Sequence, residues 1–348
     1  MPKLSKSRSS SIKQEEFLVA KPFTVNRIVT HCWPHLDEIV AIWLLWVFGQ
    51  KLFPGVPEAP VEFWGDGNQP PDGKSWQEHE AEGTLFIGIG GGRFDEHPAD
   101  GSSRKVGECT ATLVARHLGL LERRELDMIL EHVRKEDLEA GFGAFSLGSI
   151  VKSMHKSGMD PKWVMNWVFD ALDAKLKEQE TFLAALNFLD GFVLPERLAQ
   201  IGGKSHTLVV VTTANPETNR AAGYRHFVKG GSVTVVQSNP DTGHHYIFVR
   251  GPAQQRLPEI ARQIRLAERS LHGCESVDFQ ALLAEGRVAG AECWWLAAIG
   301  LFNGSLTATD VPPSKLSLDE IVACVKRAFA EGSTSVPNSS PVPVAVEA

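Results

Sequence analysis

The chain has 348 residues, of which 43% are hydrophobic and 22% charged, and its formal net charge is -7 at pH 7. This length accommodates two domains of about 150 residues each, and the composition is that of an ordinary water-soluble globular protein. The net charge argues against a broadly basic surface but leaves room for a local basic groove that binds nucleic acid. The five cysteines are scattered without a Cys-x-x-Cys pair, so neither a zinc knuckle nor a disulfide framework is indicated, and we expect a reducing, cytoplasmic location.

The two ends of the chain are predicted to be disordered tails. Residues 1–20 begin with a serine-, lysine- and arginine-rich stretch that lacks the apolar centre of a secretory signal. Residues 332–348 are rich in serine, proline and valine. The apolar run at 40–48 is too short to span a bilayer, which takes about 20 residues, so we expect no membrane partner. Between the tails we predict two α/β domains, at 21–198 and 199–331.

Apolar runs in the N-terminal domain predict alternating strands and helices. A long polar loop is expected at 68–83, because this stretch contains paired prolines and few apolar residues. Alternation of this kind is typical of a mainly parallel sheet flanked by helices. The expected elements are strands at 25–29, 61–64 and 84–89, and helices at 39–48, 111–118, 121–134, 147–155 and 163–192.

The C-terminal domain has a different texture, with β-branched runs and a predicted hairpin. The strands at 231–237 and 244–250 are separated by an Asn-Pro-Asp-Thr-Gly turn. A Trp-Trp pair lies in another apolar stretch, at 292–299. We expect a smaller, mixed α/β domain. Its remaining expected elements are a strand at 206–213 and helices at 219–228, 257–270 and 316–329.

Two histidines and an aspartate lie directly after the first predicted strand. His31, His35 and Asp37 have the spacing His-x3-His-x-Asp in a strand-to-helix turn. Open α/β sheets place their chemistry at the carboxyl ends of strands, and a tight turn directs such donors into one concavity. Imidazole and carboxylate ligands together suit Mn, Fe, Zn or Co. We predict a metal site here, with a set of unrelated surface or core residues as the alternative.

A second strand end carries a similar combination of side chains. Asp95, Glu96 and His97 follow the glycine-rich end of a predicted strand. In a parallel sheet this segment could lie beside the first cluster, and the two could hold two metal ions about 3.5–4 Å apart. The glycines at 88–92 follow a strand, as in a dinucleotide-binding motif, but no helix begins directly after them. We interpret them as a close approach of the backbone to a metal or ligand.

Further along the chain, three features carry weaker signals. Asp137 ends a predicted helix in a run of mixed charges, which by composition alone favours a solvated helix end. His244 follows a turn glycine, and its simplest interpretation is an ordinary strand residue. Asn303-Gly304-Ser305 is a turn that could offer backbone N–H groups to a phosphate, although most such turns bind nothing.

Together these motifs resemble the DHH phosphoesterase superfamily, which includes RecJ-type nucleases and manganese-dependent inorganic pyrophosphatases. Within it, they look most like the melanocyte-proliferating-gene family of metal-dependent exonucleases. The stretch at 30–38 is similar to the family's Thr-His opening and His-x-Asp-Glu element. The stretch at 87–91 is similar to a strand ending in Val-Asp-Val-Gly-Gly, and Phe94-Asp95-Glu96-His97 to a Tyr/Phe-Asp-His-His motif. The likeness spans about 25–330 but rests on short motifs.

The resemblance implies a divalent transition metal, with Mn²⁺ as the expected ion. Its ligands would be His31, His35, Asp37, Asp95 and Asp137, the last in the place of a later family aspartate. A water molecule activated by the metal would be the nucleophile.

The resemblance also implies roles for neighbouring residues. Glu96 would act as an additional or replacement ligand or a catalytic carboxylate, and His97 would orient or protonate the substrate near the scissile phosphate. The implied substrate residues of the C-terminal domain are His244, Asn303, Gly304 and Ser305. We further expect arginines of this domain, such as Arg225 and Arg250, to neutralise the phosphate.

The chain departs from the family pattern at two positions. Gly88 stands where the family has a strand-end aspartate, and Asp-Glu-His replaces Asp-His-His. Loss of a bridging carboxylate should weaken a two-metal site. We predict a metal-dependent phosphoester hydrolase acting on a phosphorylated small molecule, a nucleotide or short RNA. The alternatives are a catalytically silent binding or scaffold protein that retains the fold, and a metal hydrolase acting on a non-phosphate substrate. The oligomeric state is left open.

Overall fold

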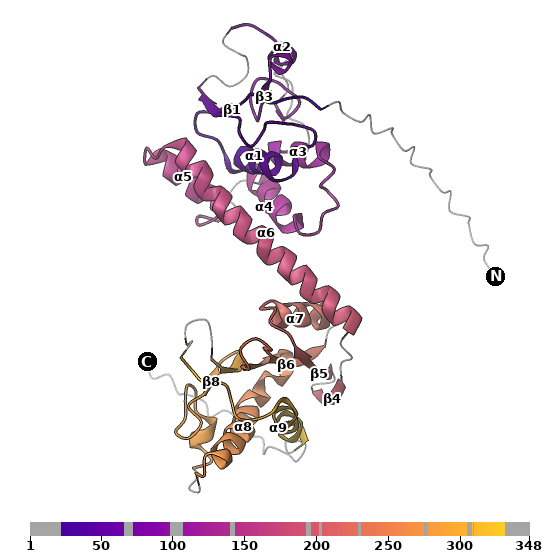
Figure 1. Ribbon diagram of the computed structural model, residues 1–348, viewed down its shortest axis with the longest axis vertical. Coiled ribbons are helices and arrows are strands. Elements are labelled where there is room, and N and C mark those ends of the chain that lie inside the picture. The colour runs from indigo at the N-terminus through magenta and orange to yellow at the C-terminus, as the bar shows by residue number, and fades with distance from the viewer. Residues whose placement is uncertain are drawn as a thin grey trace, which may run out of the picture. The chain divides into compact units, whose positions relative to one another are not determined.

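The computed structural model describes residues 22–65, 72–97, 107–139, 143–192, 196–201, 204–228, 231–274, 278–304, 308 and 310–330. The predicted tails at 1–20 and 332–348 lie outside these residues, as does Ser305. The chain forms two compact units, Met1–Lys177 (unit 1) and Glu178–Ala348 (unit 2), each of mixed α/β architecture (Figure 1). The boundary between the units falls inside a long helix, N-terminal to the one expected at 198.

Unit 1 contains a parallel sheet of three described strands. The central strand β1 (Arg27–His31) pairs with β2 (Val61–Trp64) on one side and β3 (Thr84–Phe86) on the other. Both pairings are parallel, with Ile28 opposite Val61 and Leu85. The predicted parallel sheet is therefore confirmed, and all three strands end at the same edge.

Helix α1 (Leu36–Phe48) is the centre of the unit 1 core. Its residues 36–45 are all buried, as expected for a helix that is apolar around its whole circumference. It packs against α3 (Thr110–His117), α4 (Asp127–Leu138) and α5 (Leu147–Lys156). This surrounding layer of helices fixes the direction in which the first turn of α1 points.

Three sequence predictions for unit 1 need correction. Helix α2 (Trp76–Ala81) occupies part of the expected loop, because the Ser75 hydroxyl and the Glu78 carboxylate form a capping box at its start. Strand β3 ends at Phe86 rather than at 89, because Gly88 and Gly90 adopt left-handed backbone angles, with φ of 68° and 79°. Helix α4 begins at Asp127 rather than at 121, since turns occupy residues 121–126.

Helix α6 (Pro161–Phe192) contributes to the cores of both units. In unit 1 its residues Val164, Val168 and Leu172 join the cluster around α1. In unit 2 its Ala185 and Leu189 join a cluster beneath the second sheet. The predicted helix at 163–192 is confirmed.

Unit 2 is built on a mixed sheet of six described strands, in the order β4-β5-β6-β7-β9-β8. The β5–β6 pair is parallel and the other pairs are antiparallel. The β6–β7 pair confirms the predicted hairpin. The strands are β4 (Glu196–Ile201), β5 (Lys204–Thr212), β6 (Ser232–Ser238), β7 (His245–Arg250), β8 (Trp294–Ala297) and β9 (Gly300–Asn303).

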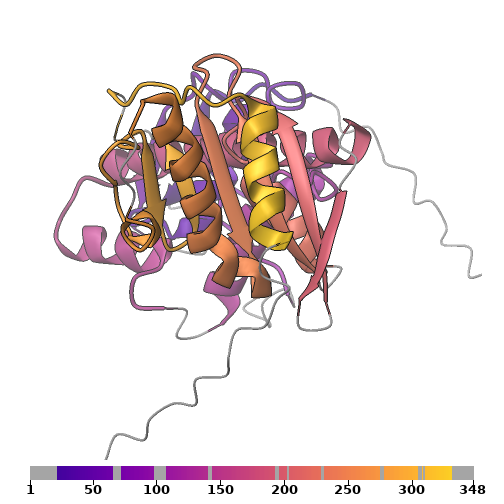
Figure 2. The same cartoon turned by 90° about the horizontal axis from the view of Figure 1, so that it is seen from below.

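Helices cover the two faces of this sheet unequally. Helices α8 (Leu257–Leu271) and α9 (Leu318–Ala330) lie side by side across one face (Figure 2). On the opposite face, α7 (Thr218–Val228) packs on β6. Two short 3-10 helices, η1 (Gly251–Arg256) and η2 (Ala281–Leu283), lie in the connections. Within the described ranges, no helix combines the length and apolar character needed to cross a bilayer.

Candidate metal centre

Two strand ends bring acidic and histidine side chains together at one edge of the unit 1 sheet. The turn before α1 follows β1, and the segment at 87–97 follows the neighbouring strand β3. A pocket of about 280 Å³ lies between these segments and the helices α4 and α5. The polar side chains that line it are those of His35, Asp37, Glu96, His97, Glu136, Asp137 and Lys152.

Thr110 connects the two strand-end segments. Its backbone N–H donates to Oδ2 of Asp37 at 3.2 Å, and its hydroxyl donates to Oε2 of Glu96 at 2.5 Å. Both carboxylates are buried, with 3% and 4% of their surface exposed. Thr110 is the first residue of α3, so the partial positive charge of the helix N-terminus also favours two ionised carboxylates here. Helix α3 thus sets Asp37 and Glu96 beside each other.

Asp137 joins the site from helix α4. Its carboxylate, the Asp37 carboxylate and the Cys109 sulfur each offer an atom within 4.8 Å of the other two. Burial, and then the negative charge of Asp37, raise the pKa of the Cys109 thiol to about 11. Cys109 is therefore a neutral thiol at pH 7, and the two aspartates are the better candidate metal ligands of this group. By composition alone, Asp137 was predicted to lie at a solvated helix end; instead it is half-buried and lines the pocket.

His35 supplies an imidazole to the same group of side chains. Ligand atoms of His35, Asp37 and Glu38 lie within 4.8 Å of one another. Burial lowers the pKa of His35 below its ordinary value, and the positive charge of Lys152 acts in the same direction. The ring is therefore neutral at pH 7, which is the form that binds a metal ion.

Glu38 organises the turn and was not among the predicted site residues. Its Oε1 accepts hydrogen bonds from the Thr30 hydroxyl at 3.0 Å and from Nδ1 of His31 at 2.6 Å. Its Oε2 accepts the backbone N–H of His35 at 2.7 Å. The hydrogen bond to Glu38 raises the pKa of His31 and fixes its ring so that Nε2 is left for a ligand. The position of Glu38 as third residue of a helix was the available sequence signal.

Gly88 makes room for this carboxylate. Its φ is +68°, and a Cβ atom at position 88 would lie 2.6 Å from Oε1 and 2.7 Å from Cγ of Glu38. An aspartate at this strand end would therefore collide with Glu38. The resemblance implies a carboxylate at position 88, but the residue there is glycine. The Glu38 carboxylate lies beside Gly88 instead.

The segment Asp95–His97 is held by its own short-range hydrogen bonds. Oδ2 of Asp95 accepts the backbone N–H of Gly91 at 2.8 Å, and Oδ1 accepts the backbone N–H of His97 at 2.8 Å. Nδ1 of His97 lies 3.2 Å from Oδ1 of Asp95 and 3.7 Å from Oε1 of Glu96. Asp95 thus orients His97, while Glu96 and His97 face the pocket.

The predicted substrate residues of unit 2 do not form one group. Arg250 ends β7, whereas His244 immediately precedes the opposite end of the same strand. His244 donates from Nε2 to the Val311 carbonyl at 2.8 Å and lies against Gly304. The Asn303 side chain is buried, and it donates to the carbonyls of Cys293 and Pro312 and accepts the backbone N–H of Ser314. Arg225 forms an ion pair with Asp190 at 3.0 Å.

Three further residues around the pocket carry no individual signal in the sequence. Lys152 lines it from α5, and Thr110 bridges its two acidic segments. Glu136 accepts hydrogen bonds from the Ser146 hydroxyl and, at 3.1 Å, from the Gly148 backbone N–H. These roles depend on contacts between elements that are distant in sequence, so no local pattern could have identified them.

No protein-family model and no curated protein sequence matches the chain. Among solved structures, the chain is similar to PggH, a pGpG-specific phosphodiesterase from Vibrio cholerae, at 10% identity and a TM-score of 0.27, over 88% of this chain and 99% of that one. It is also similar to the DHH domain of a member of the s1p family of ribosomal proteins, at 10% identity and a TM-score of 0.26, over 90% of this chain and 87% of that one.

Proposed function

We propose that this chain is a metal-dependent phosphoester hydrolase with its centre in unit 1. The observation that carries the proposal is the meeting of His35, Asp37, Glu96 and Asp137 around one pocket. They come from α1, the segment after β3, and α4, so the fold brings together donors that are far apart in sequence. Buried carboxylates with a neutral imidazole suit a divalent transition metal, and Mn²⁺ is the ion that the sequence resemblance implies.

Each of these side chains has a role in the proposed reaction. His35, Asp37 and Asp137 would hold the metal, with Glu96 as an additional ligand. His31 and Asp95 remain candidate ligands, the first oriented by Glu38 and the second engaged with two backbone N–H groups. When bound, a divalent ion supplies Lewis-acid activation of a phosphoryl oxygen and of water.

His97 is the candidate for proton transfer at the substrate. Its ring is about half exposed at the pocket, and Asp95 contacts its Nδ1. A histidine oriented in this way can give a proton to the departing oxygen of a phosphoester. Its backbone N–H is also bound to Asp95, so the ring is attached to a fixed segment.

Lys152 provides positive charge at the same pocket. Among the described residues it forms no ion pair or hydrogen bond with another side chain, although it lines a pocket with four carboxylates, those of Asp37, Glu96, Glu136 and Asp137. An ammonium group placed there can neutralise a phosphoryl group of the substrate. The pocket volume of about 280 Å³ lies just below the range that encloses a drug-sized ligand, roughly 300–1,000 Å³. It therefore favours a small phosphoester or the end of a short chain.

The proposal is tested by a metal-supplemented activity screen on the purified chain. Nucleotides, dinucleotides and short RNAs would be incubated with Mn²⁺, Mg²⁺, Zn²⁺ or EDTA, and bound metal would be measured by elemental analysis. We expect phosphate or nucleotide release with Mn²⁺ and at least a 100-fold loss in Asp37→Asn. Asp170→Asn, at an exposed position on α6, is the matched control and should retain full activity.

Each other outcome of the screen has a defined meaning. If the protein binds no metal and releases neither phosphate nor nucleotide, it is instead a catalytically silent binding or scaffold protein. Metal uptake without release from any phosphoester indicates a metal hydrolase of another substrate class. Full activity in Asp37→Asn would mean that the centre lies elsewhere.

A further inference from the structure

A buried histidine on α5 reaches the turn that carries the candidate metal ligands. His155 is 7% exposed, and its Nε2 lies 3.1 Å from the backbone carbonyl oxygen of Pro34, which directly precedes His35. A carbonyl oxygen only accepts hydrogen bonds, so Nε2 carries the proton and donates it. The influence of His155 on the metal centre therefore passes through the backbone between Pro34 and His35.

The peptide group between Pro34 and His35 is held at both of its polar ends. Its carbonyl oxygen accepts from Nε2 of His155, and its N–H, that of His35, donates to Oε2 of Glu38 at 2.7 Å. A peptide group is planar, so two hydrogen bonds at its opposite ends fix its rotation about the chain. That rotation sets the direction in which the His35 side chain leaves the backbone.

Other contacts anchor the two ends of this turn. At its start, the Cys32 N–H donates to the Trp64 carbonyl of β2 at 2.8 Å, and Glu38 holds its end at the first turn of α1. Between these points the Trp33 side chain is 62% exposed, and Pro34 has no N–H to donate. His155 therefore anchors the middle of the turn.

Helix α5 is a firm support for this contact. The Glu136 carboxylate of α4 binds its start, and apolar side chains along it pack into the core around α1. Gly148, Lys152 and His155 have the spacing i, i+4, i+7, so they follow one face of the helix. Gly148 and Lys152 line the candidate metal pocket. The face of α5 that borders the pocket thus continues to His155.

Packing alone does not account for a histidine at this position. Nδ1 of His155 is buried, and among the described residues it has no hydrogen-bond partner. A buried polar atom without a partner lowers the stability of the fold, whereas a methionine side chain fills such a space without this cost. The hydrogen bond to Pro34 is the contact that only a donor at this position can make.

We propose that His155 is a positioning residue of the metal centre, which holds the peptide group between Pro34 and His35 and so aims the His35 imidazole. The inference rests on the proposed function, because it concerns the same metal centre. Loss of the hydrogen bond should weaken metal binding without weakening the fold. An apolar side chain leaves the Pro34 carbonyl without this donor but also removes the unpartnered Nδ1, and these two effects on stability oppose each other.

Methionine and glutamine at position 155 separate the hydrogen bond from the packing. Both are unbranched and of similar length, but only glutamine has an amide N–H to replace Nε2–H. We expect His155→Met to raise the dissociation constant for Mn²⁺ about tenfold, at the lower end of the range typical of residues that orient ligands, and His155→Gln to stay within about twofold of the parent. Isothermal titration of the full chain measures the affinity. Urea denaturation should give similar midpoints for the three proteins.

Hydrogen exchange of the metal-free chain is a second measurement, which does not depend on the proposed function. With EDTA present, peptides that cover residues 31–37 should exchange faster in His155→Met than in the parent, and at the parent rate in His155→Gln. If the parent binds no Mn²⁺, the proposed function fails and this comparison alone tests His155. Unchanged exchange in His155→Met would then overturn the positioning role.

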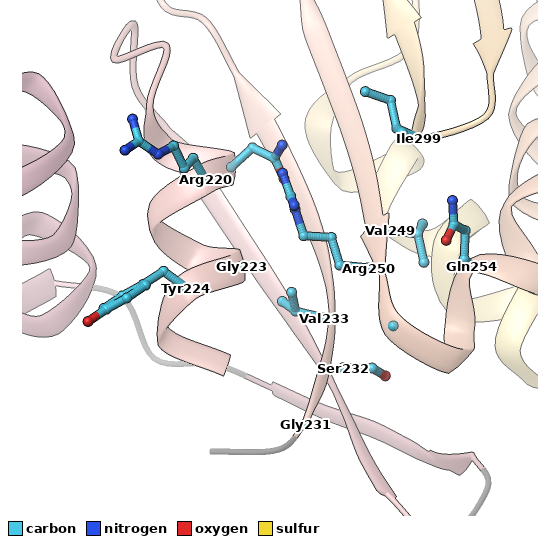
Figure 3. Close-up of a pocket in the computed structure, with 12 residues that line it drawn as sticks. Arg220, Gly223, Tyr224, Gly231, Ser232, Val233, Val249, Arg250, Gln254 and Ile299 are labelled. Atoms are coloured by element: carbon cyan, nitrogen blue, oxygen red, sulfur yellow. The ribbon is translucent and has the colours of Figure 1, made fainter. Parts of the chain in front are cut away.

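A glutamine of unit 2 provides the matched control. Gln254 lies at a pocket of about 550 Å³ (Figure 3) and donates from Nε2 to the Ala298 carbonyl at 2.7 Å, which is also a bond from a side chain to a distant carbonyl. Gln254→Met should leave both the Mn²⁺ affinity and the exchange of residues 31–37 unchanged. Parent-like Mn²⁺ affinity in His155→Met overturns the proposal. So does an equal loss in the methionine and glutamine variants, or a methionine variant that fails to fold.

Discussion

At the scale of single residues, the geometry of the candidate metal centre depends on Glu38. One carboxylate accepts hydrogen bonds from the Thr30 hydroxyl, the His31 ring and the His35 backbone. These contacts fix the end of β1, the turn and the start of α1 with respect to one another. Hydrogen bonds to an ionised group are about twice as strong as neutral ones. A small displacement of this side chain therefore moves two predicted ligands together.

The first prediction concerns Gly88, which leaves space for the Glu38 carboxylate. Gly88→Ala combines an unfavourable left-handed backbone with a Cβ atom 2.6 Å from Glu38 Oε1. We expect a loss of about 2–4 kcal/mol in the free energy of unfolding, measured by urea denaturation, together with weaker Mn²⁺ binding.

Gly158→Ala is the matched control for this change. Gly158 also has a positive φ, of 81°, but a Cβ atom there would meet nothing within 4 Å. Its replacement should cost only the backbone term, about 1 kcal/mol, and leave metal binding unchanged. Equal losses in the two variants would show that the Gly88–Glu38 contact has no structural importance.

Several pocket residues could be predicted from the sequence because one simple rule governs them. Side chains that follow parallel strands meet at the carboxyl edge of the sheet, and His35, Asp37, Glu96 and His97 do so. Glu38 had a helix-start signal in the sequence, but its place beside the ligands could not be predicted, since it depends on the space that Gly88 leaves fifty positions away. Asp137 was assigned by resemblance, and its surroundings become evident only from the packing of α4.

At the scale of elements, the start of helix α3 does most to assemble the site. Thr110 binds Asp37 through its backbone N–H and Glu96 through its hydroxyl. Thr112, two residues further along the helix, has a purely local role. Its hydroxyl accepts the Cys109 backbone N–H at 3.0 Å and thereby closes the helix start. Thr110 therefore positions the site, whereas Thr112 stabilises the start of the helix.

The second prediction uses this division between the two threonines. Thr110→Val keeps the shape of the side chain but loses the hydrogen bond to Glu96, and we expect a 10- to 100-fold loss of Mn²⁺ affinity, the range typical of residues that orient ligands. Thr112→Val should lower the free energy of unfolding by about 1 kcal/mol. Isothermal titration with Mn²⁺ and urea denaturation measure the two effects. A comparable loss of Mn²⁺ affinity in both variants would show that Thr110 has no special role in positioning the site.

Most elements were predictable because their hydrophobic periodicity is strong. Helices α1, α5, α6 and α8 and the β6–β7 hairpin follow the sequence pattern closely. Short elements are different, because three or four residues carry little periodicity. Strand β9 follows β8 after only a tight turn, and the two were not separated in the sequence. Helix α2 is specified by its capping residues rather than by an apolar face.

At the scale of the whole chain, the two units have separate hydrophobic clusters. The largest cluster of unit 1 surrounds α1, and that of unit 2 lies between the sheet and the helices α8 and α9. The sequence pattern correctly predicts one helix at 163–192. It does not show that the two halves of α6 join different cores, because both halves have the same helical period.

The third prediction follows from the separation of the cores. Mn²⁺ binding should stabilise unit 1 by about 2.7 kcal/mol at a free concentration 100 times the dissociation constant. In hydrogen-exchange mass spectrometry, peptides from β1, α1 and α3 should then exchange more slowly, while those from β6 and β7 remain unchanged. EDTA should reverse the protection, and Asp37→Asn should not show it. Protection confined to unit 2 would contradict the assignment of the metal site to unit 1.

The contact between Gly88 and Glu38 also has an evolutionary consequence. A lineage that gains an acidic residue at position 88 must move or replace the Glu38 side chain, because both cannot occupy the same space. The two positions are therefore coupled, and neither substitution is neutral while the other residue is unchanged. In an alignment of true relatives, we expect an acidic residue at one of these positions to be accompanied by a small residue at the other. A motif search that requires an acidic residue at position 88 would therefore miss every chain in which Glu38 occupies this space.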